Sequence, residues 1–435
     1  MKKCFLVLLT ITIIFTSAAT PALAYSPSTF EVTAKNALMV SLDTGETIYS
    51  KNPEERCYPA SLTKIMTALL LIEKTKDFQK ETITVSKNAI NAMMGTGSSV
   101  AGLVEGEVLT VEQILYYLLL TSAGDSTIAI AEHCSGSESA FVDEMNSKAA
   151  ELGMNGTHYV NPHGLHDPNH YTTAYDLSIL TKEALKYDIF KKICSESRYK
   201  MPTTNKSRAK ILVTTNMLQD ISTAYYYKYA AGVKTGFTDE AGRCLISTAK
   251  NESGYSYLLI LLGCKNNGSW GSRVEFNESK KLYEWAFSQF EYKNIFDTSS
   301  VLGEAKVKLS LESDHVSLLP KTGLSAILPK KADLSTIKVD IKLKDETVNA
   351  PVKKGDNLGT AEVSYAGQTL GTLQLVAGDN VKESFILKAW DVLVKIFTST
   401  AFKIILALIV LGIVIFISYV IIINKKRKRR RRRYR

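Results

Sequence analysis

Ser61 and Lys64 are the first residues whose types and spacing suggest nucleophilic catalysis. They lie three positions apart in a helical pattern that follows Pro59, so both side chains project from one face about one turn apart. At that separation a neutral lysine amine can take the proton of the serine hydroxyl, if burial or nearby positive charge lowers the lysine pKa. The same spacing is common on ordinary helix surfaces, so this pair alone does not establish an active site.

Two later segments add groups of related chemistry. Ser122 lies between two helical patterns, where a loop would point its hydroxyl into a cleft. The triplet Lys-Thr-Gly at 234–236 lies in the strand-like run 232–238, whose small residues would let a substrate backbone lie alongside. A serine-lysine pair, a serine loop and Lys-Thr-Gly, in this order, form the signature set of penicillin-binding enzymes.

A second Lys-Thr-Gly ends the pentapeptide Leu-Pro-Lys-Thr-Gly at 319–323, which also matches a sortase signal. A sortase signal stands directly ahead of the apolar segment, whereas this copy lies far ahead of the apolar run at 404–423. The serine-lysine pair and the serine loop belong with the earlier triplet. Pro320 and Gly323 therefore predict a hairpin turn between the strand-like runs 316–319 and 324–328.

With these motifs the chain resembles the low-molecular-mass D-alanyl-D-alanine carboxypeptidases, a family of serine peptidases. The resemblance covers nearly the whole chain. It includes a C-terminal β domain before an anchor and four segments of the first domain, at 58–70, 106–120, 161–176 and 234–245. It implies an α+β, penicillin-binding and β-lactamase-like transpeptidase domain, a small all-β domain and a C-terminal transmembrane helix.

The resemblance also implies residue roles. Ser61 would attack the carbonyl of the penultimate D-alanine, Lys64 would act as general base, and Ser122 would relay a proton to the leaving D-alanine. The backbone N–H groups of Ser61 and Phe237 would form an oxyanion hole. Substrate binding would fall to Lys234, Thr235, Gly236 and Arg273. Arg273 is offset slightly from the family's carboxylate-binding arginine, and it could equally be a surface residue.

One departure from the family concerns the serine loop. The family's motif is usually Ser-x-Asn, whereas this chain has Gly124 at the third position. The neighbouring Asp125 could reach the cleft instead, or it could be a salt-bridged loop residue. The departure keeps a catalytically weak penicillin-binding sensor or structural protein as an alternative. A β-lactamase is a second alternative, although no acidic residue stands out for fast deacylation.

The elements that would position these residues follow from the local patterns. Two strands should flank the turn at 43–45, and a buried strand should span 255–262. Helices are predicted at 111–120, 126–133, 174–187 and 275–287. From 294 to 380 short alternating segments predict a small β-sandwich or barrel.

The ends of the chain predict export and anchoring. Residues 1–24 read as a signal peptide, ahead of a catalytic domain at 27–290 and a β domain at 294–380. An amphipathic interfacial helix at 384–400, or one packed on the β domain, precedes a transmembrane helix at 404–423 and a cytoplasmic polybasic tail at 424–435. The catalytic domain would then face the wall, outside the cell membrane.

Charge and metal-ligand patterns narrow the partners. The formal net charge is +10, but the tail holds ten positive charges and the signal peptide two, so the body is nearly neutral and nucleic acid is not expected. His163, His166 and His170 lie among loop-forming residues, and the cysteines lack zinc-site spacing, so neither a metal nor a cofactor is predicted. The resemblance implies peptidoglycan pentapeptide stems as substrate, β-lactam antibiotics as acylating inhibitors and membrane lipid around the C-terminal helix.

Overall fold

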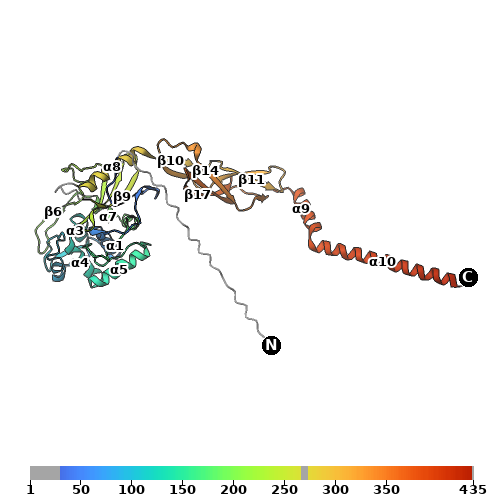
Figure 1. Ribbon diagram of the computed structural model, residues 1–435, viewed down its shortest axis with the longest axis horizontal. Coiled ribbons are helices and arrows are strands. Elements are labelled where there is room, and N and C mark those ends of the chain that lie inside the picture. Colours follow the sequence, from blue (N-terminus) through green and yellow to red (C-terminus); the bar gives the residue numbers. More distant parts are fainter. Residues whose placement is uncertain (1–29, 266–272, 434–435) are drawn as a thin grey trace, which may run out of the picture. The chain divides into compact units, whose positions relative to one another are not determined.

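The computed structural model describes residues 30–265 and 273–433, with side chains up to Lys426. The predicted signal peptide lies outside the described residues. The chain divides into two compact units (Figure 1). The first comprises residues 1–292 together with 327–331, and the second comprises 293–326 and 332–435. A short stretch beyond the expected catalytic domain thus packs with the first unit.

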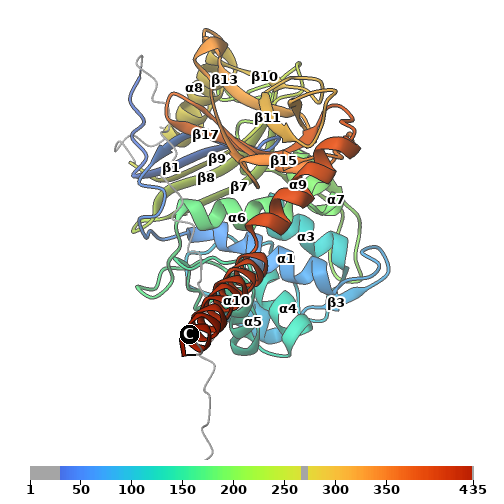
Figure 2. The ribbon, with the colours of Figure 1, turned by 90° about the vertical axis from the view of Figure 1, so that its right-hand side faces the viewer.

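A five-stranded antiparallel sheet forms the centre of the first unit, in the order β2-β1-β9-β8-β7. Figure 2 shows its strands side by side. β1 and β2 flank the predicted turn, and β9 overlaps the predicted buried strand. Their bounds are Asn36–Ser41 for β1, Thr47–Lys51 for β2, Ser256–Cys264 for β9, Gly242–Lys250 for β8 and Ala230–Thr238 for β7. β7 is an edge strand of this sheet, and its last four residues, 235–238, line a cavity.

Alternate residues of the sheet enter two separate hydrophobic cores. Met39 and Leu259 pack against α8 (Val274–Gln289), whereas Leu38 and Ile260 pack against the helical layer on the opposite face. Figure 1 shows α8 on one side of the sheet and α1, α3, α4 and α5 on the other. This alternation is the period of two that a strand requires when both of its faces are buried.

The helical layer holds the serine-lysine pair, and the loop with Ser122 connects two of its helices. Its members are the 3₁₀ helix η1 (Ala60–Thr63), α1 (Lys64–Lys74), α2 (Lys87–Asn91), α3 (Val111–Leu120), α4 (Gly124–Ser135), α5 (Glu138–Glu151), α6 (Ala174–Ala184) and α7 (Asp188–Ser195). The same unit contains two small two-stranded sheets. One pairs β3 (Thr82–Thr84) with β4 (Val108–Thr110), and the other pairs β5 (Arg198–Met201) with β6 (Lys210–Val213). A capping box between Thr110 and Gln113 fixes the start of α3 at its predicted position.

Two helices differ from their predicted bounds. α4 begins at Gly124, two residues earlier than expected, which places Asp125 in the first turn of a helix and not in a loop. α6 ends at Ala184, because Leu185 caps it and a turn through Lys186 leads into α7. The predicted helix 174–187 therefore merged the end of α6 with a turn.

The second unit is built on a six-stranded sheet in the order β14-β16-β17-β12-β11-β15. Its strands are β11 (Gly303–Lys308), β12 (His315–Pro320), β14 (Lys338–Leu343), β15 (Thr347–Asn349), β16 (Asn357–Tyr365) and β17 (Gln368–Ala377). A short 3₁₀ helix, η2 (Leu334–Thr336), precedes β14. Ala366 and Gly367 both have positive φ and form the tight hairpin turn between β16 and β17.

The predicted hairpin around Lys321–Gly323 is wrong in its pairing. β12 precedes this turn and pairs with β11 and β17, whereas β13 (Leu324–Pro329) follows it and pairs with β10 (Phe290–Phe296). Lys321 N–H donates to Gln374 O, which ties the turn to the end of β17. The sequence predicted the turn but not that the two flanking strands belong to different sheets, because a local alternation of apolar and polar residues does not encode which strands pair.

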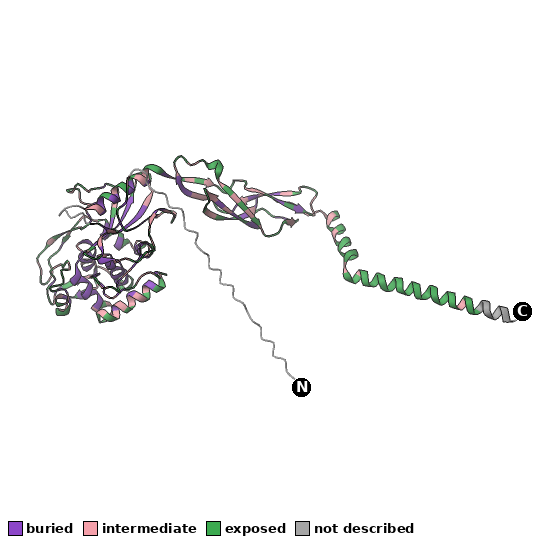
Figure 3. Ribbon diagram, in the orientation of Figure 1, coloured by how far each residue is buried: buried purple, intermediate pink, exposed green. Residues whose placement is uncertain are grey.

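Two helices end the chain: α9 (Phe385–Thr398) and α10 (Thr400–Arg433). No residue of α9 is buried, which argues against the alternative of a helix packed on the β domain (Figure 3). Within the described residues, α10 is the one helix long and apolar enough to cross a membrane, over Thr400–Lys426. This stretch contains the span predicted at 404–423.

Candidate active site

The first motif lies where η1 runs into α1. The tighter turn of a 3₁₀ helix aligns side chains three positions apart, and Lys64 Nζ lies 3.0 Å from Ser61 Oγ. Two glycines allow the surrounding backbone to approach η1. A Cβ on Gly236 of β7 would lie 3.1 Å from Pro59 O, and a Cβ on Gly164 would overlap the carbonyl of Ala60. The serine-lysine pair therefore lies between β7 and the loop that contains Gly164, and both pack closely against it.

Lys64 is placed to act as a base. Its side chain is 1 % exposed, and Nζ also donates to His163 O at 2.6 Å. Burial and, second, the nearby charge of Lys234 lower the pKa of Lys64 well below its ordinary value, against an opposing effect of Asp125. A lysine that is neutral at physiological pH has a lone pair to accept the Ser61 proton.

Lys234 is the second buried amine of the site. Its side chain is 1 % exposed, Nζ donates to Thr235 O at 3.0 Å, and burial lowers its pKa to about 7. A positive charge on Lys234 disfavours protonation of Lys64, so the two buried amines are linked electrostatically.

Ser122 lies between the end of α3 and the start of α4, as predicted. It has a positive φ of 62°, it is 6 % exposed, and it lines the same cavity as Ser61. A positive φ is uncommon for a residue with a side chain and marks a conformation that the surroundings impose. The loop therefore presents this hydroxyl at a fixed place in the cleft.

Gly124 is enclosed by a loop that the sequence did not single out. Its N–H donates to Ser99 O at 2.6 Å, and a Cβ at this position would lie 2.5 Å from Ser98 Oγ and 2.8 Å from Met93 Sδ. Ser98 also lines the cavity with Ser61. A serine hydroxyl from another segment thus occupies the space beside Gly124 that a side chain at this position would need.

Asp125 does not lie among the residues that line the cleft. Its carboxylate accepts hydrogen bonds from the backbone N–H groups of Ala101, Leu103 and Ser126, at 2.9 to 3.1 Å. It is 3 % exposed, and none of the ion pairs found among the described residues includes it. Asp125 is therefore neither a cleft residue nor a salt-bridged loop residue, which were the two interpretations from the sequence. Its carboxylate instead fixes the 98–104 segment against α4.

The cleft also carries hydroxyl and guanidinium groups from β7, from the segment after β6 and from the residue before α8. Thr235 Oγ1 lies 2.6 Å from Thr215 Oγ1, and Thr215 N–H donates to Leu120 O, which links β7 to the end of α3. Arg273, the residue before α8, lines the cavity and lies 3.8 Å from the buried Glu275 carboxylate. Arg243 lies 3.7 Å from the same carboxylate. Burial, the largest effect on Glu275, raises the pKa of that carboxyl.

The cavity that joins these groups has a volume of about 990 Å³, which is within the range of small-molecule and peptide sites. It brings together six of the sequence-predicted site residues: Ser61, Ser122, Thr235, Gly236, Phe237 and Arg273. Lys64 and Lys234 lie buried behind this surface. Phe237 is 46 % exposed, and the Arg243 guanidinium lies 5.1 Å from its ring centre.

The loop histidines support η1. His170 Nε2 lies 2.8 Å from Thr63 Oγ1, which in turn donates to Ala60 O. Val160 N–H donates to His170 Nδ1, so Nε2 carries the proton, and burial lowers the pKa of His170 to about 3. His163 contributes its backbone carbonyl to Lys64. Among the described residues, no group of three or more His, Cys, Asp or Glu side chains is arranged to hold a metal ion.

Sequence reasoning missed Ser98, Thr215 and Arg243. Ser98 and Thr215 belong to none of the segments that carry the resemblance, and Arg243 lies in the segment 234–245 without a role assigned to it. Each reaches the cleft through tertiary packing: a loop against α4, the segment after β6, and the start of β8. For Arg243 the sequence offers a weak signal. A tight turn after β7 leads into an antiparallel strand, and such a strand places Arg243 opposite Phe237. For Ser98 and Thr215 the sequence offers no comparable signal.

Comparison with known proteins gives the family. A family model described as D-alanyl-D-alanine carboxypeptidase matches residues 22–266, and one described as penicillin-binding protein 5, C-terminal domain, matches 290–383. D-alanyl-D-alanine carboxypeptidase DacF of Bacillus subtilis (strain 168) is 35% identical over 355 residues, 81% of this chain and 86% of the relative. DacC of Escherichia coli (strain K12) is 29% identical over 371 residues, 83% of this chain and 87% of the relative.

Solved structures agree with these matches. The crystal structure of penicillin binding protein 5 from Haemophilus influenzae superposes with a TM-score of 0.64 at 25% identity. The superposition covers 83% of this chain and all of that one. The likeness therefore extends through both units.

Proposed function

We propose that Ser61 is the nucleophile of this chain, which belongs to the D-alanyl-D-alanine carboxypeptidase family. The members of this family are serine hydrolases that act on D-Ala-D-Ala termini in peptidoglycan. The protein removes the terminal D-alanine from peptidoglycan pentapeptide stems, and β-lactam antibiotics acylate the Ser61 hydroxyl. The observation that carries the assignment is the 3.0 Å approach of Ser61 Oγ to a buried Lys64 amine whose pKa is lowered.

Acylation begins with the stem laid along the edge strand β7. Ser61 Oγ attacks the carbonyl carbon of the penultimate D-alanine, and Lys64 Nζ takes the hydroxyl proton. The backbone N–H groups of Ser61 and Phe237 stabilise the negative charge that develops on the carbonyl oxygen. The C–N bond then breaks and the acyl group remains as an ester on Ser61. Ser122 gives its hydroxyl proton to the departing D-alanine amine and receives in exchange the proton that Lys64 had taken up, so Lys64 is neutral again.

The terminal carboxylate is held by groups of β7 and of the residue before α8. Thr235 donates its hydroxyl hydrogen to the carboxylate, Lys234 contributes positive charge from behind the strand, and Gly236 leaves space for the substrate backbone. Arg273 attracts the carboxylate from the start of α8, although Glu275 at 3.8 Å offsets part of its charge. A water molecule, activated by the neutral Lys64 amine, hydrolyses the ester and restores Ser61.

We propose that this site lies outside the cell. Residues 1–24 direct export, α10 crosses the membrane, and the positive residues from Lys425 onward stay in the cytoplasm. α9 lies in the interface, with Trp390 at headgroup level. The catalytic domain therefore faces the wall, where peptidoglycan stems are located.

A two-substrate assay tests the proposal. The full chain in detergent micelles receives a pentapeptide ending in D-Ala-D-Ala and, separately, a labelled penicillin. Wild type should release D-alanine and retain the label, and Ser61→Ala should do neither. Rapid penicillin turnover would instead indicate a β-lactamase. Stable labelling without D-alanine release would indicate a penicillin-binding sensor, and equal behaviour of wild type and Ser61→Ala would refute the mechanism.

A further inference from the structure

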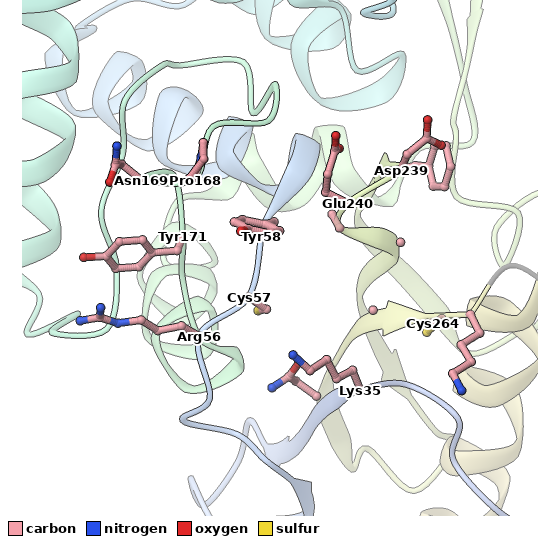
Figure 4. A pocket seen from close by; sticks show the side chains of 16 residues that line it. Lys35, Arg56, Cys57, Tyr58, Pro168, Asn169, Tyr171, Asp239, Glu240 and Cys264 are labelled. Carbon is pink, nitrogen blue, oxygen red and sulfur yellow. The ribbon is translucent and has the colours of Figure 1, made fainter.

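A second hollow adjoins the catalytic cleft at the turn between β7 and β8. Its volume is about 860 Å³, and it shares Phe237, Asp239 and Glu240 with the cleft lining. We call it the turn pocket, and Figure 4 shows its walls. They come from the start of β1, the segment leading into η1, the loop at 168–171, the β7–β8 turn and the end of β9. A ligand in the cleft could thus extend into the turn pocket past one turn.

Arg56 is one of the cations of this pocket, together with Lys35 and Lys265. The Arg56 guanidinium lies over the Tyr171 ring, with its central carbon 4.3 Å from the ring centre. In the part of the chain that the structure describes, no carboxylate lies within ion-pair distance of it. Lys35, in contrast, is paired with Glu55 at 2.8 Å. An arginine beside an aromatic ring, with no carboxylate partner among the described residues, has N–H groups that can bind a planar anion.

The pocket is electrically asymmetric, which limits how a ligand can lie in it. Figure 4 shows Arg56 and Tyr171 on one wall and Asp239 and Glu240 on the opposite side. A carboxylate would be attracted to the first wall and repelled from the second. At the β1 side, the buried Asn36 Oδ1 has no hydrogen-bond donor among the described residues, while its Nδ2 donates to Asn52 O and Glu55 O.

The short chain segment between Arg56 and Ser61 limits how far the turn pocket can lie from the proposed nucleophile. Arg56 precedes Ser61 by five residues, which span at most about 17 Å when extended. A peptide that pairs with the edge of β7 runs past Phe237 toward the β7–β8 turn as it leads away from the scissile bond. The residue before the terminal D-Ala-D-Ala, with an extended side chain, then lies within reach of the Arg56 side chain.

We propose that the turn pocket binds a side-chain carboxylate on the stem residue that precedes D-Ala-D-Ala, with Arg56 as its partner. The inference rests on the proposed release of D-alanine at Ser61, and it adds a specificity-determining residue outside the reacting groups. Arg56 stabilises the bound peptide equally before and during the reaction, so it lowers KM and leaves kcat unchanged.

The test uses the full chain in detergent micelles and two pentapeptides that differ in one group. In one, the residue before D-Ala-D-Ala carries a side-chain carboxylate, and in the other it carries the corresponding amide. Wild type should show a KM about tenfold lower for the carboxylate peptide, as one charge-assisted hydrogen-bonded pair provides. Arg56→Gln should raise that KM to the level of the amide peptide without changing kcat. Arg208→Gln, which removes an exposed arginine outside both linings, should behave as wild type.

Two results would overturn the proposal: equal KM values for the two peptides in wild type, or an equal KM increase for both peptides in Arg56→Gln. A binding measurement with Ser61→Ala separates this from failure of the proposed function. That variant should bind the carboxylate peptide about tenfold more tightly than the amide peptide, even if wild type released no D-alanine. Loss of D-alanine release with this preference intact would refute the hydrolysis and not the pocket.

Discussion

The chemistry at the residue scale depends on two buried lysines with different tasks. Lys64 lies 3.0 Å from the Ser61 hydroxyl, and Lys234 donates to the backbone of the neighbouring Thr235. Burial lowers the pKa of both amines, and the charge of Lys234 lowers that of Lys64 further. The pH therefore controls how many protons the pair holds, and with it the supply of base.

The acylation rate should consequently fall on the acid side. Below the pKa of Lys64 the amine is protonated and cannot accept the Ser61 proton, so acylation by a labelled penicillin should rise with pH and then level off. Lys64→Arg keeps a positive charge that does not deprotonate, and it should acylate at least about 10²-fold more slowly at every pH. The second-order rate constant across the pH range measures both effects. An unchanged profile in Lys64→Arg would contradict the role of Lys64 as base.

Gly124 offers a second residue-scale prediction, because the space beside it is filled. Restoring the family's side chain with Gly124→Asn would drive the new Cβ against Ser98 Oγ and Met93 Sδ, at 2.5 and 2.8 Å. We expect a loss of about 1–3 kcal/mol in the free energy of unfolding and no gain in acylation rate. Denaturant melts and penicillin labelling measure the two. In a Ser98→Gly background the loss should shrink, and an equal loss in both backgrounds would exclude Ser98 as the obstacle.

At the scale of elements, the local patterns located most helices and strands. The α3 bounds follow from the Thr110 capping box, and β16 and β17 follow from alternation around the turn at 366–367. The proximity of Ser61 and Lys64 followed from their spacing, because residues three apart in a helical turn lie on one face, whereas their proposed role needed the other motifs as well. What sequence reasoning could not supply was pairing between distant segments. The strand exchange after Pro320, the Ser98 loop against Gly124 and the Thr215–Thr235 contact all depend on it.

Gly164 shows how one such contact positions Ser61, the proposed nucleophile. Its φ of +83° favours glycine, and a Cβ there would overlap the Ala60 carbonyl that precedes Ser61. Gly164→Ala should therefore lower both the free energy of unfolding and the acylation rate. Gly45→Ala is the matched control, since φ is +80° with no atom within 4 Å of the added Cβ. The control should lose only the conformational cost of about 1–2 kcal/mol and acylate normally. Equal behaviour of the two variants would show that crowding at Ala60 has no effect on the site.

At the scale of the whole molecule, the chain's charge and apolar surface are segregated. Most of the net positive charge lies beyond the membrane span, while α9 exposes large apolar residues such as Phe385, Trp390 and Phe397. Lys388 and Lys395 lie on the same helix and are paired with Glu383 and Asp391. A helix with this composition and no buried residue has a reason to contact lipid even without α10.

Shortened chains separate the contributions of α9 and α10. A chain ending after Ser399 keeps α9, and a chain ending after Glu383 lacks both helices. The longer one should co-sediment with vesicles that contain anionic lipid and the shorter one should not, because only the longer retains the apolar face of α9. Trp390→Glu in the longer chain should reduce binding, since a charge at the headgroup anchor opposes insertion. Both shortened chains should label with penicillin like the full chain, which shows that the catalytic domain is intact. Equal sedimentation of the two would mean that α10 alone holds the chain at the membrane.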